Sequence, residues 1–247
     1  MSESDNPARV ARPRARQKLP KRFYAKASAA PHGEGFAVLL DGRVAKTPAR
    51  RPLVVARRAL AEVLASEWEV QRGDIDPATM PLTRIVNAAI DRVADQAAAV
   101  RTAIVDYAGN DLICYRAGGP VGLVAAQEKA WSPILTFARE GLGARFVLAE
   151  GVVHVAQDSR ALAAIERAVA PFDALALAAL HTVTTLTGSA LIALGLAHGA
   201  VSAEAAWQAA HVDEDWQMSQ WGEDTLAMER RAGRWQEMKA AAFILAA

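Results

Sequence analysis

Residues 36–48, FAVLLDGRVAKTP, decide how the chain folds after its first segment. Two runs of β-prone residues flank Asp41-Gly42, a dipeptide that accepts the positive φ angles of a tight two-residue turn. Pro48 then limits how far the second run extends, because proline cannot donate a hydrogen bond to a strand ladder. The stretch therefore predicts a β-hairpin.

Downstream of the hairpin, apolar residues recur at helical spacing. One stripe runs from Leu60 to Trp68, and a second begins near Thr83, a suitable N-cap, and continues to Ile104. Residues 121–140 also have a helical pattern, in which Pro133 either starts a new helix or kinks the first. From residue 159 the chain is rich in alanine and leucine and is predicted to be helical, with breaks at Pro171, Gly188, Gly199, Gly222 and Gly233.

Two further strand signals precede this helical part. LICYRA (112–117) predicts a short strand, and RFVLAEGVVHVA (145–156) predicts a second hairpin with its turn at Glu150-Gly151. Strands early in the chain and helices afterwards favour an α+β fold. We therefore expect a small N-terminal mixed α/β domain over residues 32–156 and a C-terminal helical domain over residues 157–247.

Residues 1–31 carry eight basic and two acidic side chains, although the net charge of the whole chain is only +1. This segment has few large apolar residues, so we expect a solvated, disordered arm. A targeting presequence is the alternative, and Glu3, Asp5 and three prolines argue against it. Only Phe23 and Tyr24 interleave the arm's charges, so we expect no nucleic-acid partner.

One cysteine and one long uncharged stretch bear on disulfide formation and on membrane insertion. Cys114 alone forms no internal disulfide and no thiolate metal cage, and its apolar surroundings predict a small core residue. Residues 174–203 carry no Asp, Glu, Lys or Arg and are long enough to cross a bilayer. Threonines and Gly188 interrupt them, so we expect two buried helices that meet near Gly188 and no stable membrane insertion.

The sequence lacks common catalytic and nucleotide-binding motifs, among them GxGxxG, GxxxxGK[ST], GxSxG and HExxH. His211 and Asp215 are four residues apart on a predicted helix, a spacing at which two side chains can hold one metal. A metal-assisted enzyme that uses this pair and nearby carboxylates is therefore the alternative function.

Residues 213–224, DEDWQMSQWGED, combine five carboxylates with two tryptophans. On a helix over residues 204–221, Trp207, Glu214, Met218 and Trp221 lie near one face. In one interpretation the tryptophans and the methionine face the core and the acids are solvated. In the other they line a groove beside a carboxylate, and the acidic rim selects a basic partner.

Six segments together resemble the assembly chaperones that handle the alpha subunit of the ATP synthase F(1) head. They follow one another through nearly the whole chain after the arm: FAVLLDGRVAKTP (36–48), EWEVQRGDIDPATMPLTRIVNAAID (67–91), YAGNDLICYRA (107–117), QEKAWSPIL (127–135), TGSALIALGLAHG (187–199) and DEDWQMSQWGED (213–224). Each segment alone is weakly specific. The combination of EW-x-x-Q before MPLT with TGS and WQ-x-x-x-WG downstream is specific.

The resemblance implies a small N-terminal mixed domain, a C-terminal orthogonal α-helical bundle, and binding without catalysis or a cofactor. The implied partner is the unassembled F(1) alpha subunit, whose subunit interface the chaperone covers until beta pairs with it. An unpaired subunit interface is a large exposed patch and a liability for aggregation.

The family's acidic C-terminal motif falls on Glu214, Gln217, Trp221 and Gly222. We expect partner contact or shaping of the contact surface from Asp213, Glu214, Trp216, Gln217, Trp221 and Glu223. A second set is expected to be structural: Trp68, Met80, Pro81, Thr83 and Gly188. DTLAMERR (224–231) departs from the family, which often continues with further acids and a histidine, and the arm has no counterpart in it.

The resemblance also bears on location and oligomeric state. We expect a monomer in the cytoplasm of a bacterium, because the chain is rich in alanine and its short arm is not a clean presequence. The mitochondrial matrix is the alternative, since the family occurs there too.

Overall fold

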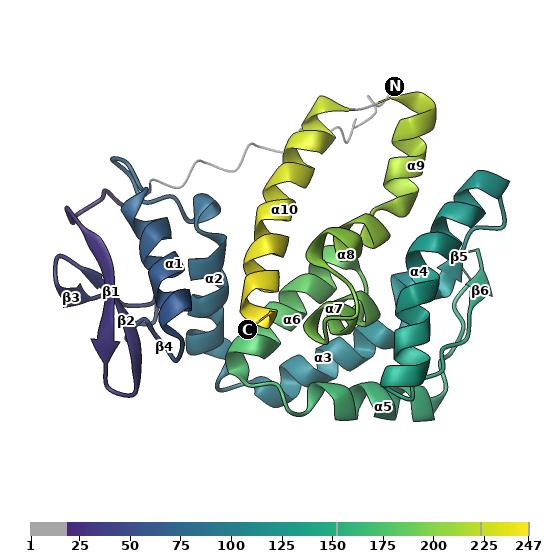
Figure 1. Cartoon of the computed structure of the whole chain (residues 1–247), viewed down its shortest axis with the longest axis horizontal. Coiled ribbons are helices and arrows are strands. Elements are labelled where there is room, and N and C mark those ends of the chain that lie inside the picture. Colours follow the sequence, from purple (N-terminus) through teal and green to yellow (C-terminus); the bar gives the residue numbers. More distant parts are fainter. Residues whose placement is uncertain (1–18, 152, 223, 247) are drawn as a thin grey trace, which may run out of the picture.

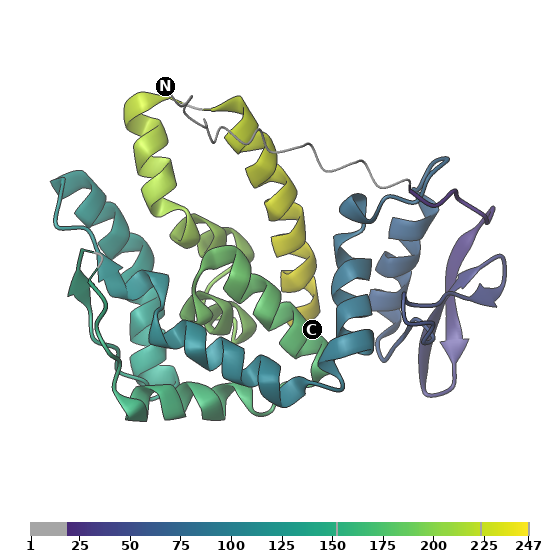
Figure 2. The ribbon, with the colours of Figure 1, turned by 180° about the vertical axis from the view of Figure 1, so that it is seen from behind.

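The structure is a computed structural model that describes residues 19–151, 153–222 and 224–246. A small sheet lies at one end of the molecule, and the remainder is mainly helical, with a pair of short strands beside a long helix at the other end (Figures 1 and 2). The strands are β1 (Ala27–His32), β2 (Gly35–Leu40), β3 (Arg43–Val44), β4 (Val54–Val55), β5 (Tyr115–Arg116) and β6 (Ala149–Glu150). The α-helices are α1 (Arg58–Glu69), α2 (Pro81–Ala88), α3 (Ala97–Gly109), α4 (Val121–Gly141), α5 (Ser159–Val169), α6 (Ala174–Thr187), α7 (Ala190–Ala197), α8 (Ala203–Ala210), α9 (Val212–Trp221) and α10 (Thr225–Leu245). Short 3-10 or π helices lie at η1 (Pro77–Thr79), η2 (Ala89–Val93) and η3 (Leu112–Cys114).

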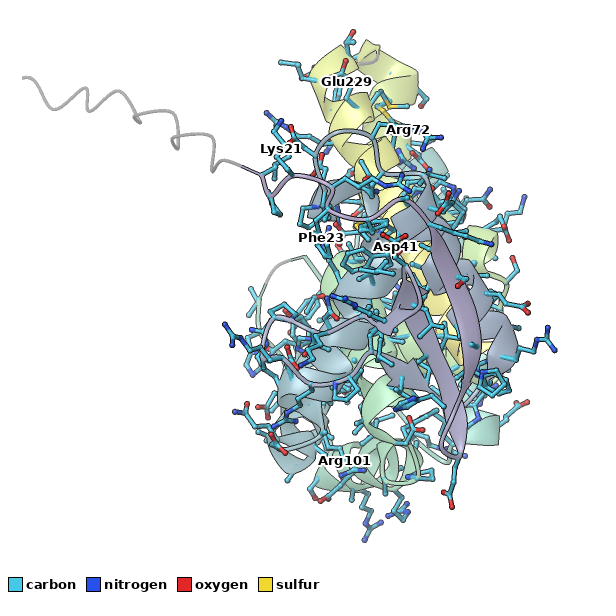
Figure 3. The ribbon with its side chains drawn as sticks, turned by 90° about the vertical axis from the view of Figure 1, so that its left-hand side faces the viewer. Lys21, Phe23, Asp41, Arg72, Arg101 and Glu229 are labelled. Carbon is cyan, nitrogen blue, oxygen red and sulfur yellow. The ribbon has the colours of Figure 1, made fainter. Side chains whose placement is uncertain are left out.

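The sheet at this end of the molecule is built around β2, which pairs antiparallel with β1, β3 and β4. The predicted hairpin is confirmed: Leu40 pairs with Arg43, and Asp41 and Gly42 have φ angles of 48° and 79°. Helix α1 packs on β1 and β2. Figure 3 shows this end of the molecule with its side chains.

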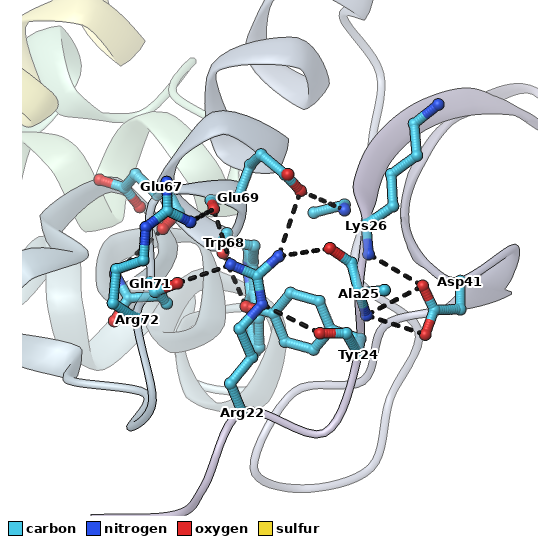
Figure 4. A network of polar contacts seen from close by, with 11 residues as sticks. Arg22, Tyr24, Ala25, Lys26, Asp41, Glu67, Trp68, Glu69, Gln71 and Arg72 are labelled. Atoms are coloured by element: carbon cyan, nitrogen blue, oxygen red, sulfur yellow. Dashed lines mark hydrogen bonds and ion pairs between the residues drawn. The ribbon is translucent and has the colours of Figure 1, made fainter.

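The prediction of a disordered arm over residues 1–31 is wrong for its last part, because β1 begins at Ala27. Residues 1–18 lie outside the described part of the chain. Tyr24 is buried, and its hydroxyl donates a hydrogen bond of 2.7 Å to the carbonyl of Trp68. The Arg22 guanidinium donates to the carbonyls of Tyr24, Ala25, Glu69 and Gln71 (Figure 4). The composition of this segment does not predict its ordered structure, because the order comes from the hydrogen bonds of one arginine and the burial of one tyrosine.

Strand β1 forms an edge of the sheet that offers few free donors. Along an antiparallel strand, the backbone N–H and C=O groups of successive residues point alternately toward the partner strand and away from it. The outward N–H of Ala27 donates to the Glu69 carboxylate at 2.5 Å, and Pro31 in the same alternation has no N–H. A proline and a capped N–H protect an edge strand against pairing with other chains.

The residues of EW-x-x-Q and MPLT are in direct contact. The Glu67 carboxylate accepts hydrogen bonds from the backbone N–H groups of Leu82 and Thr83 at 2.9 and 2.7 Å, so it caps the N-terminus of α2. The expected cap at Thr83 is therefore wrong: α2 begins at Pro81, and Thr83 lies in its first turn. Met80 and Thr83 are buried, and Gln71 fixes the intervening loop by bonds to Thr79 and Asp76.

The long helix expected from Thr83 to Ile104 is also wrong, because it divides into α2, the π turn η2, and α3. Polar contacts hold this break against the loop between β3 and β4. Asp91 accepts hydrogen bonds from the Thr47 hydroxyl and the Ala49 N–H, and Asp95 pairs with Arg51 at 2.7 Å. These contacts join residues more than 40 positions apart, which periodicity cannot reveal.

The second predicted hairpin is wrong as well. Strand β6 pairs in parallel with β5, with Tyr115 opposite Ala149, and the segment after Gly151 does not return along it. LICYRA forms the turn η3 followed by β5. Pro133 lies inside α4, which runs unbroken, and Gly233 lies inside α10, where a break was expected.

Helices α3 and α4 pack against helices that follow residue 157. Helix α3 contacts α5, α6 and α7, and α4 contacts α7, α8 and α9. The expected boundary at residue 156 therefore falls within one packed body, and the β1–β4 sheet with α1 and α2 forms the smaller part. The correction has a physical reason: the strand signal at 145–156 belongs to a two-residue strand on the surface of the helical part.

The uncharged stretch forms α6 and α7, as expected. Gly188 separates them with a left-handed φ of 69°, and its carbonyl accepts from the Leu112 N–H. Asp111 is fully buried and accepts from the Leu191 N–H at the start of α7. Cys114 is buried, and burial raises the pKa of its thiol to about 12. In the described ranges, no helix combines the length and apolar character needed to cross a bilayer.

Candidate functional site

The acidic tryptophan stretch begins at a break between two helices, where a single helix was expected. Helix α8 ends at Ala210 and α9 begins at Val212, so the expected helix over residues 204–221 is wrong. His211 lies at the break, with its imidazole buried against the ring of Trp207 at 3.9 Å. Its Nδ1 donates a hydrogen bond of 2.8 Å to the Trp207 carbonyl. Trp207 therefore belongs to the core, and it does not share a face with Trp221.

Helix α9 has no fully buried residue, and the first half of α10 is mostly exposed. The two helices extend away from the core side by side and meet near Gly222 (Figures 1 and 2). The buried residues of α10 lie in its C-terminal half, from Met238 to Ile244. The acidic stretch thus lies on an extension of the helical body.

Two contacts hold α9 against α4. The Gln127 amide is buried; its Nε2 donates to the Asp213 carboxylate at 2.7 Å, and its Oε1 accepts from the Ala117 N–H at 2.8 Å. The indole of Trp216 lies over Gly122, where the Cβ of any other residue would overlap its six-membered ring. Asp213 and Trp216 therefore position α9.

A third contact holds α9 against α10. The Asp215 carboxylate pairs with the Arg231 guanidinium, which is mostly buried. Because Asp213 and Asp215 lie about 200° apart around a helix, they engage neighbours on different sides of α9. Glu214 lies between them in sequence and forms no ion pair with the described residues of α4 or α10.

The free face of α9 carries Glu214, Gln217, Met218 and Trp221, at helical offsets of three, four and seven residues. The Glu214 side chain is 61% exposed, and one of its carboxylate oxygens lies 4.0 Å from the His211 Nε2. Trp221 is 81% exposed. A shallow hollow of about 300 Å³ adjoins these residues and reaches Met228 and Arg231 on α10. Glu223 lies outside the described residues.

The electrostatics of this face are acidic at neutral pH. Burial lowers the pKa of His211, so the imidazole is neutral and leaves the Glu214 charge uncompensated. Asp213, Glu214 and Asp215 occupy the first turn of α9, where the helix dipole favours negative charge. The surface is therefore suited to a partner with basic side chains near an apolar patch.

The side chains of His211 and Asp215 are held by different partners in this fold. The His211 Nδ1 is bonded to the Trp207 carbonyl, and Asp215 is bonded to Arg231. Across the part of the chain that the structure describes, no three His, Cys, Asp or Glu side chains lie close enough to hold one ion.

The residues that position α9 could not be predicted from the sequence. Gln127, Gly122 and Arg231 lie on other helices, and no local pattern links them to residues 213–221. The capping role of Glu67 also carries no signal of its own, although EW-x-x-Q and MPLT lie only 15 to 16 residues apart where the bonds form. A glycine in the first turn of α4 was the one available signal, because glycine there allows a close approach.

The chain is similar to the proteins of one family and to solved structures of bacterial proteins. A family described as ATP12 chaperone protein matches residues 21–139. A crystal structure of a chaperone candidate from Agrobacterium tumefaciens is 49% identical, covers 92% of this chain and 85% of its own, and superposes with a TM-score of 0.87. Atp12 from Paracoccus denitrificans is 38% identical over 92% of this chain and 97% of its own, with a TM-score of 0.83. An aspartate-to-lysine mutant of the same Paracoccus protein is 37% identical over the same shares, also with a TM-score of 0.83.

The fold and these similarities place the protein in the class of assembly chaperones, which are not enzymes. Within that class, the chain belongs to the ATP12 chaperone family, whose members serve the assembly of ATP synthase.

Proposed function

We propose that this chain binds the unassembled alpha subunit of the ATP synthase F(1) head and shields its subunit interface until beta pairs with it. The observation that carries the proposal is the free face of α9, where an exposed carboxylate and a largely exposed tryptophan lie one above the other on a helix held from two sides. Exposed tryptophans on a fixed helix are typical anchors of protein interfaces.

The contact residues in this proposal are Glu214, Gln217 and Trp221. Asp213 and Trp216 act through α9, because their side chains contact α4. Glu223 extends the acidic character of the surface in the sequence. Trp221 supplies buried apolar area on binding, and Glu214 supplies charge selection for a basic site on the client.

A chaperone of this kind binds strongly enough to compete with aggregation and weakly enough to be displaced by beta. An exposed pair of charges contributes little affinity in water but sets orientation and association rate. An interface with one tryptophan anchor and an acidic rim fits that requirement, since beta replaces it with a larger contact.

The test is the affinity of purified alpha subunit for the wild type and for Glu214→Lys. We expect the variant to bind about tenfold more weakly, since a reversed charge at an interface opposes a basic partner. It should keep its fold, because a substitution at an exposed helical position changes stability by about 0.5 kcal/mol or less.

Glu204→Lys is the matched control, because Glu204 is an exposed acid in the first turn of α8 and lies outside the free face of α9. Equal weakening in both variants would indicate nonspecific electrostatics and move the contact away from Glu214. Unfolding of Glu214→Lys would mean that Glu214 stabilises the fold, and the contact assignment would then be wrong.

We further propose that the chain works as a monomer in the bacterial cytoplasm. The two source organisms of the similar structures are bacteria, which supports this location. Sedimentation of the purified protein and the mature N-terminal sequence check the two statements, and cleavage near residues 20–30 would contradict the cytoplasmic location.

A further inference from the structure

A second hollow is lined by residues of the segment before β1, of β2, β3 and α1. These elements lie at the sheet end of the molecule, away from α9 (Figure 1). It measures about 730 Å³, more than twice the hollow beside α9. Its lining combines an apolar wall and a basic rim: Phe23, Tyr24, Leu40 and Trp68 form the wall, and Arg43 and Lys46 lie on the rim.

The apolar wall continues from the core to the solvent through three aromatic rings. Phe23 meets Tyr24 edge to face at 5.4 Å, and Tyr24 lies 5.9 Å from Trp68. Tyr24 is buried, whereas Phe23 is 73% exposed and lies on the same side of the molecule as Asp41 (Figure 3). The indole Nε1 of Trp68 is buried and has no acceptor among the described residues. An exposed aromatic ring above a packed aromatic base is typical of a contact site.

The two basic side chains of the rim are free of ion pairs among the residues that the structure describes. Arg43 and Lys46 are exposed, and neither forms an ion pair with a residue that the structure describes. Asp41, the carboxylate in the lining, is already bonded to the N–H groups of Ala25 and Lys26. Asp41 keeps its negative charge, because these N–H groups lower the pKa of its carboxyl, so the lining carries two positive charges and one negative charge next to an apolar surface.

We propose that this hollow is a second docking site, and that it takes a segment of the client with a large apolar side chain next to a carboxylate. The apolar side chain packs against Phe23, and the carboxylate pairs with Arg43 and Lys46. The inference rests on the proposed function only in naming the client. Charge complementarity carries the choice of occupant, because the chain's own first 18 residues are basic and the rim would repel them.

Two sites of opposite charge give the chaperone a defined orientation on its client. The face of α9 selects a basic region and the hollow selects an acidic one, so a client that is turned end for end meets like charges at both places. Binding at two sites also raises the affinity above that of either one when both engage together.

The test compares variants of the hollow for binding to isolated alpha subunit. We expect Phe23→Ala, and separately the double variant Arg43→Glu with Lys46→Glu, to weaken binding about tenfold, as loss of an interface anchor does. The melting temperature should stay unchanged, since all three side chains are exposed. The defect of the charge variant should also shrink as salt is raised.

The controls match each change elsewhere on the surface. Val121→Ala removes another exposed apolar side chain, and Arg145→Glu with Arg160→Glu makes the same change in net charge at exposed positions. Both should bind within about twofold of the wild type. If the wild type failed to bind alpha subunit, the proposed function would be overturned. If the wild type bound and the hollow variants bound equally well, only the second site would be overturned.

A photo-cross-linking amino acid at position 23 then identifies the occupant. We expect a cross-link to a segment of the alpha subunit in which an acidic residue lies beside a large apolar one. A cross-link to a basic segment, to the chain's own N-terminus, or to the acidic α9 of a second copy would overturn the proposal.

Discussion

At the scale of single residues, neighbouring side chains with the same chemistry take different positions. Of the three consecutive acids in α9, Asp213 and Asp215 bond to α4 and α10, and Glu214 remains exposed. Of its two tryptophans, Trp216 lies over Gly122 and Trp221 is exposed. The sequence indicated this set of residues. It did not indicate which of them hold α9 in place and which are exposed, because that depends on Gln127, Gly122 and Arg231.

Gly122→Ala tests the packing of the Trp216 ring on Gly122. The new Cβ would overlap the indole, so Trp216 must move and α9 must shift from α4. We expect alpha-subunit binding to weaken by about 3- to 10-fold with a loss of about 1–2 kcal/mol in stability, as overpacking of a close contact does. Tryptophan fluorescence and a binding isotherm report the two effects.

Gly233→Ala is the matched control for this change, because a Cβ at Gly233 meets no atom within 4 Å. Alanine inside a helix is favoured over glycine by about 0.5–1 kcal/mol, so this variant should be more stable and bind normally. Normal binding by Gly122→Ala would show that the position of Trp216 is irrelevant to the client.

Asp111 gives a prediction for pH. Burial raises the pKa of its carboxyl from 3.8 to about 6, although the Ser189 hydroxyl and backbone N–H groups favour the ionised form. The folded state therefore holds the proton more tightly than the unfolded state does. The stability from this group is fully present below about pH 3.8 and is lost as pH rises to about 6, with a change of about 3 kcal/mol across that window.

Asp111→Asn should remove this component, so the difference in unfolding free energy between wild type and variant should change between about pH 4 and 6 and level off above it. Denaturant unfolding across that range measures the difference. A difference that does not vary with pH would mean that the carboxyl of Asp111 titrates normally in the fold.

At the scale of elements, the cap on α2 joins two motifs that the sequence presents separately. Glu67 on α1 accepts from the Leu82 and Thr83 N–H groups and is largely buried, and burial raises the pKa of its carboxyl. Glu67→Ala leaves these donors without a partner. We expect the free energy of unfolding to fall by about 1–2 kcal/mol, the typical effect of losing a helix cap.

Glu62→Ala on the same helix is the control, because Glu62 is exposed and pairs only with Arg58 four residues away. It should cost about 0.5 kcal/mol or less. If the two variants lost equal stability in thermal unfolding, the cap would have no special role in holding α2.

The elements that the sequence predicted correctly are those whose signal is local. The turn at Asp41-Gly42, the helix stripe from Leu60 to Trp68 and the break at Gly188 each follow from a few adjacent residues. The errors concern contacts between distant parts. Strand β6 exists only by pairing with β5, and the break between α2 and α3 is held by Thr47, Ala49 and Arg51.

At the scale of the whole molecule, the two candidate docking surfaces lie at different ends of one packed structure. Helix α10 contacts α2 on one side and α6, α7 and α8 on the other, and Arg84 of α2 pairs with its Glu237 at 2.9 Å. The extension that carries α9 and the sheet end are thus joined through packed helices. The α+β class was predictable from the sequence. The packing that connects the two ends, and the place of α3 and α4 in the helical body, were not.

Our central proposal is that the chain covers the alpha-subunit interface which beta later occupies. Light scattering of purified alpha subunit, with and without an equimolar amount of the chain and followed by addition of beta, tests it most directly. We predict that the chain suppresses the aggregation of alpha, and that beta then displaces the chain as alpha and beta pair. A stable complex that contains the chain, alpha and beta together, or aggregation that proceeds unchanged, would contradict the claim.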